Sequence, residues 1–380
     1  MNTVYLDNNA TSMVAPEVVE AMNPFFKDLW GNPSSMHAFG GQVRHYVEEA
    51  RAKVASLIGA DPNEIIFTSC GSESNNMAIR GAVERTKKSS PIITTTVEHP
   101  AVSSICSYLS SRGHPLSLIE CDTEGHINLD QLRGAISEDT AIVSVMWANN
   151  ETGVVFSIDE IAHISQRVGI LFHTDAVQAV GKIPIDVKKI PVDLLSLSGH
   201  KFHAPKGIGA LYIRKGTKIN PLIYGGHQES GMRAGTENVP YIVGLGCACE
   251  LAAQSIVNEN KKIRVLRDRL ERGILSACPH VRINGDREHR MPNTSNMSFE
   301  YINANEIVAR LDKVGIAVSA GAACSAGSLK LSHVMQAMGV PCAMARGTIR
   351  FSLSRYTTQE QIDYVLAHLP GIIEHLRNEG

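Results

Sequence analysis

The stretch IVSVMWANNETGVVFSIDEIAHISQRVGILFHTD, from Ile142 to Asp175, carries the clearest secondary-structure pattern of the chain. It begins with an apolar run rich in β-branched residues, Ile142–Trp147, and continues into an amphipathic segment, Ile158–Val168. A second apolar run follows at Ile170–His173. A strand, a helix and another strand in this order are typical of parallel strands joined by a crossover helix. The stretch therefore predicts one unit of an α/β sheet.

The same alternation continues towards the N-terminus. Further strands are predicted over Ile65–Thr68, Ile92–Val97 and Leu116–Glu120. Amphipathic segments lie between them, at Asn75–Lys87 and Ala101–Arg112. We therefore expect an α/β domain with a mostly parallel central sheet that helices cover on both faces.

From about residue 260 the pattern changes. The elements predicted there are a charged helix at Asn260–Leu275, a strand at Asn296–Glu300, a helix at Asn305–Val314, strands near Ile316–Ser319 and Thr348–Leu353, and a final helix after Thr357. At 380 residues a single core is not expected. We predict a large domain at residues 14–258 and a smaller α+β domain made of residues 1–13 and 259–380.

The composition is that of a globular protein, with 43% hydrophobic and 19% charged residues. The 38 acidic and 36 basic side chains give a net charge of -2, so the basic excess expected of a nucleic-acid-binding protein is missing. No stretch approaches about 18 consecutive apolar residues, and we expect no membrane span. The start, MNTVYLDNNA, does not resemble a secretory signal. We therefore expect a cytoplasmic location.

The eight cysteines do not form the close pairs of a disulfide framework. Cys247 and Cys249 are the closest pair, but their spacing matches no zinc site, and we expect no structural metal. Seven thiols are expected to be reduced and mostly buried. Cys324 differs, because its stretch SAGAACSAGSLKLS, residues 319–332, is made of small residues typical of a loop. There its thiolate could act as a nucleophile.

The strongest chemical signal is SLSGHKFHAPKGIGALYIRKG, Ser196–Gly216. Lys201 lies there among Ser198, His200 and His203 rather than in a run of charges. It is a candidate Schiff-base lysine, whose amine must be desolvated or close to other cations to be neutral. An exposed loop lysine is the simpler interpretation of Lys201 alone, because lysines are rarely buried.

Asp175 strengthens the cofactor interpretation, because it follows an apolar strand run. A carboxylate at that position could keep a pyridine nitrogen protonated, and a pyridinium ring is an electron sink. Helix capping from Ala176 is the alternative role. Gly71 and Ser72 follow another strand and precede a helix, where backbone N–H groups favour a phosphate dianion. His99 also follows a strand and could stack on a planar ring, although a structural role is the alternative.

These segments resemble the cysteine desulfurases of the class-V aminotransferase group, which are pyridoxal-phosphate (PLP) enzymes of fold type I. Further matching motifs are YLDNNATS at Tyr5–Ser12, GNPSSMHAFG at Gly31–Gly40, VMWANNETG at Val145–Gly153, GGHQESGMRAGTEN at Gly225–Asn238 and RFSLSRYTT at Arg350–Thr358. The similarity runs from the N-terminus to the final helix. The sequences of these motifs are most similar to those of the nitrogen-fixation (NifS) type.

The resemblance implies a PLP site. Lys201 would hold PLP as a Schiff base, Asp175 would pair with its pyridine nitrogen, and His99 would stack on its ring and serve in catalysis. The other residues implied to hold the cofactor are Gln178 at the phenolic oxygen with Asn150 nearby, Gly71, Ser72, Ser198 and His200 at the phosphate, and Thr236 from the other subunit of a homodimer. No metal is implied.

The resemblance also implies a substrate pocket for L-cysteine. Arg350 would bind the substrate carboxylate with its planar guanidinium, and Asn8, Asn9 and Asn150 would belong to the same pocket. The Cys324 thiolate would take the sulfur as a persulfide, L-alanine would leave, and the sulfur would pass to an acceptor protein. An iron–sulfur scaffold serving nitrogenase is the expected acceptor.

One departure from the family concerns the stretch before Cys324. Family members carry Ser-Ser-Gly-Ser-Ala-Cys-Thr, whereas this chain has Ser-Ala-Gly-Ala-Ala-Cys-Ser at residues 319–325. The change removes two hydroxyl groups and leaves the nucleophile itself. An aminotransferase or a selenocysteine lyase on the same scaffold is an alternative activity. A PLP-binding regulator or sulfur-relay protein without enzymatic activity is another.

Overall fold

The computed structural model describes residues 3–320 and 331–379. A seven-stranded sheet with the order β2-β8-β7-β6-β5-β3-β4 forms its centre. The strands are β2 (Ile65–Thr68), β3 (Ile92–Thr95), β4 (Leu116–Ile119), β5 (Ile142–Ser144), β6 (Phe172–Asp175), β7 (Leu194–Ser198) and β8 (Gly209–Ile213). Only β8 runs antiparallel to its neighbours, so the predicted mostly parallel sheet is confirmed.

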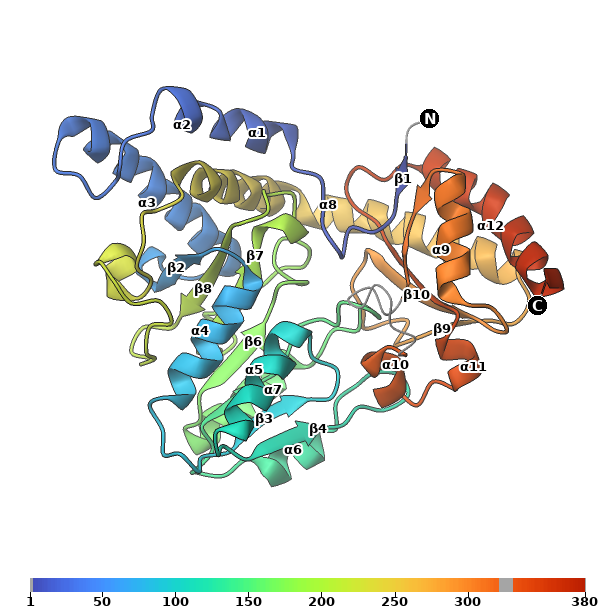
Figure 1. The fold of residues 1–380 in the computed structure, drawn as a ribbon, viewed down its shortest axis with the longest axis horizontal. Helices are drawn as coiled ribbons and strands as arrows, with labels where there is room; N and C mark the ends of the chain where they lie inside the picture. Colours follow the sequence, from blue (N-terminus) through green and yellow to red (C-terminus); the bar gives the residue numbers. More distant parts are fainter. Residues whose placement is uncertain (1–2, 321–330, 380) are drawn as a thin grey trace.

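Helices cover both faces of this sheet (Figure 1). The helices α4 (Gly71–Val83) and α5 (Pro100–Ser111) pack on one face, and α3 (Ala38–Ile58) and α7 (Ile158–Val168) pack on the other. Because both faces of the sheet are covered, successive side chains of a strand must enter opposite cores, and those of β2 do so. Its Ile66 side chain joins the core beneath α4 and α5, whereas Ile65 and Phe67 join the core beneath α3.

Shorter helices complete the large body: α1 (Pro16–Met22), α2 (Pro24–Lys27) and α6 (Leu129–Ala135). The predicted bounds of β2 and α7 are correct, and β6 is shifted by two residues from the predicted Ile170–His173. As a result, Asp175 is the last residue of β6 rather than a residue beyond it. The long helix α3 was absent from the sequence prediction.

The smaller body is an α+β unit, as expected. Its antiparallel sheet has the order β12-β13-β10-β9. The elements are β9 (Val281–Ile283), β10 (Thr294–Phe299), β12 (Ser319–Ala320), β13 (Thr348–Ser352), α9 (Ala304–Lys313), α10 (His333–Ala337), α11 (Cys342–Ala345) and α12 (Gln359–Glu379). Near the N-terminus, β1 (Val4–Tyr5) pairs in parallel with β11 (Ile316–Ala317). The N-terminal strand therefore belongs to the smaller body, and the chain then crosses to the large one (Figure 1).

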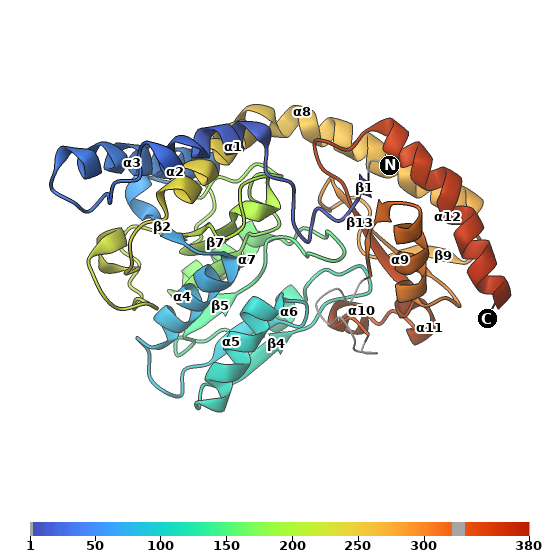
Figure 2. The ribbon, with the colours of Figure 1, turned by 45° about the horizontal axis from the view of Figure 1, so that its top comes forward.

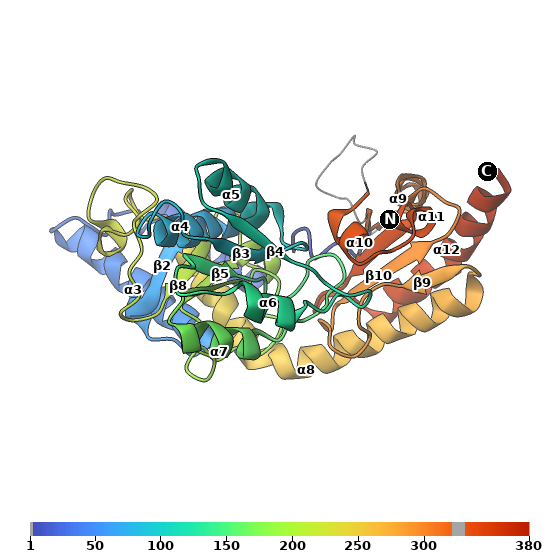
Figure 3. The same cartoon turned by 90° about the horizontal axis from the view of Figure 1, so that it is seen from below.

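One continuous helix, α8 (Val239–Ala277), joins the two bodies. Its first half packs against α1 and α3 and its second half against α12, so it runs along both bodies (Figures 2 and 3). The helix predicted at Asn260–Leu275 is therefore only its second half. The predicted domain boundary between residues 258 and 259 lies inside α8, and Val334–Ala345 side chains pack with the large core. The domain division stays a prediction.

By length and composition alone, α8 is the one helix among residues 3–320 and 331–379 that could cross a membrane. Half of its most apolar window is buried inside the protein. The packing of α8 along the two bodies accounts for the buried half of this window.

The contact between α3 and α8 depends on a glycine. A Cβ atom added at Gly246 would lie 2.7 Å from Ala50 Cα, whereas one added at Gly134 of α6 meets nothing within 4 Å. Gly246→Ala should lower the free energy of unfolding by about 1–3 kcal/mol because the helices must separate. Gly134→Ala should raise it by up to about 1 kcal/mol through helix propensity. Chemical denaturation measures both, and a stabilised Gly246→Ala variant would contradict the close packing.

Candidate active site

Lys201 lies directly after β7, in the short helix η2 (Gly199–Lys201). Its Nζ donates hydrogen bonds to the backbone oxygen atoms of Asn9, at 2.7 Å, and Ala10, at 2.8 Å. The hydroxyl of Ser12 accepts a further bond from the backbone N–H of His203. The segment that follows β1 is thus fastened against the carboxyl end of β7, and the half-buried Lys201 amine lies where the two bodies meet.

Asp175 lies at the carboxyl end of the adjacent strand, β6, and is 5% exposed. Its carboxylate accepts hydrogen bonds from Asn75 Nδ2 of α4, at 2.7 Å, and from the Val177 backbone N–H, at 3.0 Å. Burial raises the pKa of Asp175, while these donors and the charges of His99 and Lys201 oppose the rise. A buried carboxylate with neutral hydrogen-bond partners is well suited to a cationic ring nitrogen.

His99 is the N-cap of α5, and its Nδ1 accepts a hydrogen bond from the Ala101 backbone N–H at 3.1 Å. Burial lowers the pKa of His99 below its ordinary value, an effect that the Asp175 charge opposes and the Lys201 charge supports. A neutral imidazole that accepts at Nδ1 carries its proton on Nε2. The ring is therefore held in one orientation by the first turn of α5.

Gly71 and Ser198 lie together at the same edge of the sheet. Gly71 begins α4, and a Cβ atom added to it would lie 2.6 Å from Val177 Cγ2 and 3.4 Å from Ser198 Cβ. The Ser198 hydroxyl is buried and has no hydrogen-bond partner among the described residues. An unused hydroxyl beside the N-terminus of a helix of this length favours a bound anion. Ser72, the second residue of α4, is exposed.

His200 also belongs to this edge, and its Nδ1 lies 3.2 Å from Thr11 Oγ1. Burial, with the neighbouring Lys201, Lys206 and Lys182 charges, lowers the pKa of His200 to about 4. The imidazole is therefore neutral at pH 7 and can donate a hydrogen bond without adding charge.

Asn9 connects the two bodies. Its backbone oxygen accepts hydrogen bonds from Lys201 and from Gln178 Nε2, the latter at 3.0 Å. Its side chain donates to Thr294 Oγ1 of β10 at 2.9 Å and accepts from Asn293 Nδ2 at 3.0 Å. One buried residue therefore sets the position of the large-body groups relative to the smaller sheet. Asn8, its neighbour, is bound through Nδ2 to the Ser352 backbone oxygen at 2.8 Å.

Arg350 lies in β13, and its side chain is almost fully buried. It donates to the Asn150 backbone oxygen at 2.9 Å and pairs with Asp7 at 2.8 Å. Its Nε has no hydrogen-bond partner in the described part of the chain. Asn9 Nδ2 contacts the same Asn150 oxygen at 3.3 Å. The predicted substrate residues Arg350, Asn9 and Asn150 are thus brought together, Asn150 through its backbone.

Two buried carboxyl groups beside the site were not predicted. Glu98, 1% exposed, accepts hydrogen bonds from Thr95 Oγ1 and the Met146 backbone N–H, and burial raises its pKa to about 8. Glu151 accepts a hydrogen bond from Ser332 Oγ at 2.5 Å, and burial raises its pKa to about 7. In the sequence both occur next to predicted residues, His99 and Asn150, but nothing there indicates their burial.

Lys182 was also missed. Its Nζ donates to Gln178 Oε1 at 2.8 Å and to Asn9 Oδ1 at 3.2 Å. The motif HTDAVQAVGK, which begins at His173, contains it, but the sequence gives no sign that its side chain folds back onto Gln178 and reaches Asn9.

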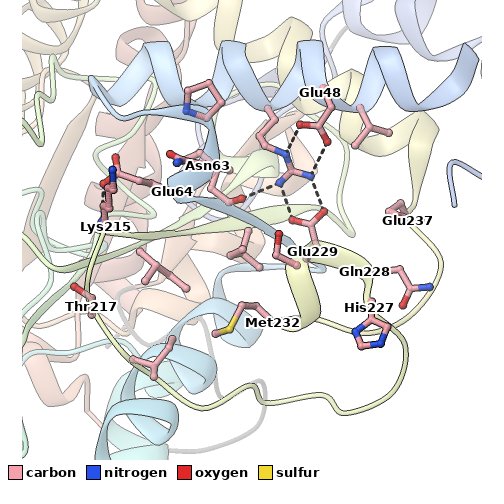
Figure 4. Close-up of a pocket in the computed structure, with 18 of the residues that line it drawn as sticks. Glu48, Asn63, Glu64, Lys215, Thr217, His227, Gln228, Glu229, Met232 and Glu237 are labelled. Atoms are coloured by element: carbon pink, nitrogen blue, oxygen red, sulfur yellow. Dashed lines mark hydrogen bonds and ion pairs between the residues drawn. The ribbon is translucent and has the colours of Figure 1, made fainter. Parts of the chain in front are cut away.

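The roles of two predicted residues stay predictions: Cys324, and Thr236, which was expected to act from the other subunit of a homodimer. Cys324 lies outside the described residues. Thr236 is exposed on a segment fixed by a buried ion pair, in which Arg51 binds both carboxylate oxygens of Glu229 at 2.8 Å. Figure 4 shows Glu48 and Glu229 on opposite sides of this guanidinium, at the wall of a cavity of about 810 Å³.

The seven cysteines of the described residues are free thiols. Cys106, Cys249 and Cys278 are buried, Cys342 is exposed, and the other three thiols are half-buried, so fewer are buried than predicted. In residues 3–320 and 331–379 no cluster of three His, Cys, Asp or Glu side chains could hold a metal ion.

The family model described as "Aminotransferase class-V" matches residues 4–365. The cysteine desulfurase NifS of Azotobacter vinelandii is 53% identical over 379 residues, covering 100% of this chain and 94% of the relative. The chain belongs to the NifS-type cysteine desulfurase family. Another member, cysteine desulfurase 2 of Trichormus variabilis, is 52% identical and covers 99% of this chain and 94% of its own length.

Solved structures of the cysteine desulfurase family have the same fold. A NifS-like protein superposes with a TM-score of 0.93 at 40% identity, covering 98% of this chain and 100% of its own. The structure of SspA in complex with cysteine gives a TM-score of 0.82 at 36% identity, with 93% and 99% of the two chains covered. The predicted fold type is confirmed.

Class-V aminotransferases use PLP, and the residues of this desulfurase-family chain fit that cofactor. The buried Asp175 carboxylate lacks a cationic hydrogen-bond partner among the described residues and suits the pyridinium nitrogen. The unused Ser198 hydroxyl and the Gly71 turn suit the phosphate, and the Lys201 amine suits the aldehyde.

The Gly71 contact leads to a test. In Gly71→Ala the added methyl group would press on Val177, whose backbone N–H holds Asp175, and we expect the dissociation constant for PLP to rise about tenfold, or about 1.4 kcal/mol. Gly41→Ala is the control, since a Cβ atom there meets nothing within 4 Å. Fluorescence titration of the cofactor-free protein measures both. Equal affinities for the two variants would contradict the assignment.

Proposed function

We propose that this chain removes sulfur from L-cysteine, with L-alanine and an enzyme persulfide on Cys324 as products. The observation that carries the proposal is the meeting of Lys201 and Arg350 at one short segment. Lys201 donates to the Asn9 backbone oxygen, and Arg350 and Asn9 Nδ2 both donate to the Asn150 oxygen. A group for an amino-acid amine and a group for its carboxylate are thus held at a fixed separation.

Lys201 and Asp175 serve the cofactor in this proposal. PLP bound at Lys201 supplies an electron sink that acidifies the substrate Cα–H bond. Asp175 keeps the ring nitrogen protonated through a buried carboxylate, and Asn75 and Val177 hold that carboxylate in place. The Lys201 amine is the group that would take the proton from the substrate Cα.

Arg350 and His99 serve the substrate. The Arg350 guanidinium is anchored through Asp7 and Asn150, which leaves its buried Nε–H as an unused donor for the substrate carboxylate. The His99 imidazole is neutral and carries its proton on Nε2. It can therefore donate or accept a proton beside the cofactor ring.

The sulfur step belongs to Cys324, which lies outside the described residues and is assigned from its sequence. Its thiolate forms an S–S bond with the substrate sulfur while the substrate Cβ–S bond breaks. The carbon fragment is protonated and leaves as L-alanine, so free cysteine and an enzyme thiol become alanine and an enzyme persulfide.

A homodimer is part of the proposal. Trp30, Met36 and Tyr224 are large apolar side chains with at least 70% of their surface exposed. The segment at residues 33–34 adjoins the Thr236 segment, since Ser34 Oγ contacts Glu237 at 3.5 Å. A second copy covering this region would bury these side chains, and Thr236 could then reach the partner's phosphate site.

The sulfur acceptor and the location complete the proposal. An iron–sulfur scaffold, here one that serves nitrogenase, would receive the persulfide sulfur. The support is the NifS-type similarity of the chain. The seven cysteines of the described residues are free thiols, which supports a reducing, cytoplasmic compartment.

The direct test is intact-mass analysis after brief exposure of the PLP-loaded protein to L-cysteine, with alanine measured in parallel. We expect one added sulfur atom on the peptide that contains Cys324, and alanine in proportion. Cys324→Ala should lose both products, whereas Cys342→Ala, which removes an exposed thiol of α11, should retain them. Full sulfur release by Cys324→Ala would contradict the mechanism.

The carboxylate role of Arg350 has its own test. Arg350→Lys should raise the KM for L-cysteine at least about tenfold, because a single ammonium group cannot keep the contacts with Asp7 and Asn150 and also donate from the position of Nε. The absorbance spectrum of the bound cofactor should not change. Arg346→Lys, at an exposed arginine after α11, is the control. Unchanged KM in the Arg350→Lys variant would exclude the proposed contact.

A further inference from the structure

Lys182 is a second lysine at the site, and the proposed mechanism assigns it no role. It follows Gly181, which has a positive φ of 74°, and both residues belong to the turn after β6. Its backbone oxygen accepts a hydrogen bond from Asn260 Nδ2 of α8 at 2.8 Å. Together with Lys201 it lines a small cavity of about 40 Å³ between the two bodies. The backbone of Lys182 is therefore fixed, and its side chain points inward.

The hydrogen-bond acceptors of Lys182 are both side-chain amide oxygens, of Gln178 and Asn9. Within residues 3–320 and 331–379 no carboxylate lies within ion-pair distance of its Nζ. This is unusual for an enclosed lysine, which normally pairs with an acid. The contacts point to a role in orienting amides rather than in charge neutralisation.

The Gln178 amide has one orientation that satisfies both neighbours. Lys182 Nζ brings N–H donors to one end of it, at 2.8 Å, so that end is the oxygen. The Asn9 backbone oxygen can only accept, so the atom 3.0 Å from it is the nitrogen. The second N–H of Gln178 has no acceptor among the described residues. It is free to bind an anionic oxygen.

We propose that Lys182 is a positioning residue, which holds the Gln178 carbonyl oxygen and so keeps the Gln178 amide N–H directed at the phenolic oxygen of the cofactor. This inference rests on the proposed function, because it requires PLP at Lys201. It assigns to Lys182 an effect that is transmitted through Gln178 and not through direct contact with the cofactor.

The role of Lys182 as a hydrogen-bond donor does not depend on its charge. Burial, followed by the nearby Lys201 and Arg350 charges, lowers the pKa of Lys182 well below its usual value. Charged or neutral, the amine retains N–H groups for Gln178. The other titratable or charged groups facing this cavity or acting on Lys182 are His200, His203, Glu259 and Arg355, of which Glu259 and Arg355 pair with each other at 3.1 Å. Burial lowers the pKa values of both histidines to about 4, so they are neutral near pH 7.

The test is a pH titration of the absorbance spectrum of the PLP-loaded protein, without substrate. The Gln178 N–H stabilises the ionised ring oxygen, so its loss should raise the pH at which the bound cofactor gives up its proton. Lys182→Met leaves the Gln178 oxygen unpartnered and frees the amide to turn. We expect the titration midpoint to rise by about one pH unit, the effect of one hydrogen bond to a charged group.

Matched variants distinguish positioning from other effects. Lys182→Arg keeps a donor and should titrate like the wild type, as should Lys188→Met, which removes an exposed lysine from the surface pair with Asp61. In a Gln178→Leu background, Lys182→Met should add no further shift. The same midpoint in Lys182→Met and wild type would overturn the inference, and so would a shift that persists in the Gln178→Leu background. If wild-type protein binds no PLP, the proposed function itself fails.

Discussion

The architecture of the site depends on the buried hydrogen bonds of Asn9. This residue lies where the chain leaves the smaller body and crosses to the large one, and its backbone oxygen binds the Lys201 amine. Its side chain is held by Thr294 and Asn293 of the smaller body. Leaving any of these buried polar atoms without a hydrogen bond is costly, so the two bodies must keep the relative position in which all of them are paired. That relative position sets the distance between Lys201 and Arg350.

Electrostatics then divide the site into a cofactor end and a substrate end. At the cofactor end the Asp175 carboxylate is buried beneath α4, and the nearby His200 imidazole is neutral. At the substrate end, Arg350 pairs with Asp7 and is bridged to Asn9 through one backbone oxygen. Burial strengthens both sets of interactions, because the local dielectric constant around buried groups is low. The sheet contributes by presenting Asp175 and Ser198 from adjacent strands.

The sequence predicted the elements whose signals are local. The strand Ile65–Thr68 and the helix Ile158–Val168 have the predicted bounds, since strict periodicity and flanking turn residues specify them. Asp175 and Gly71 were found because they lie where strands end, and Lys201 was found because it lies among Ser and His residues rather than in a run of charges. The continuity of α8 was missed, because its apolar first half and charged second half look like different segments. The burial of Lys182 and Glu98 comes from contacts between segments far apart in the chain, which no local pattern records.

Each role proposed for the site requires that the Lys201 amine, and not the neighbouring Lys182 amine, carries the aldehyde cofactor. Borohydride reduction of the PLP-loaded protein fixes the cofactor to the amine that holds it, and peptide mass mapping then identifies that lysine. We expect one pyridoxyl group per chain, on the peptide that contains Lys201. A label on Lys182, or no stable label on either lysine, would contradict it.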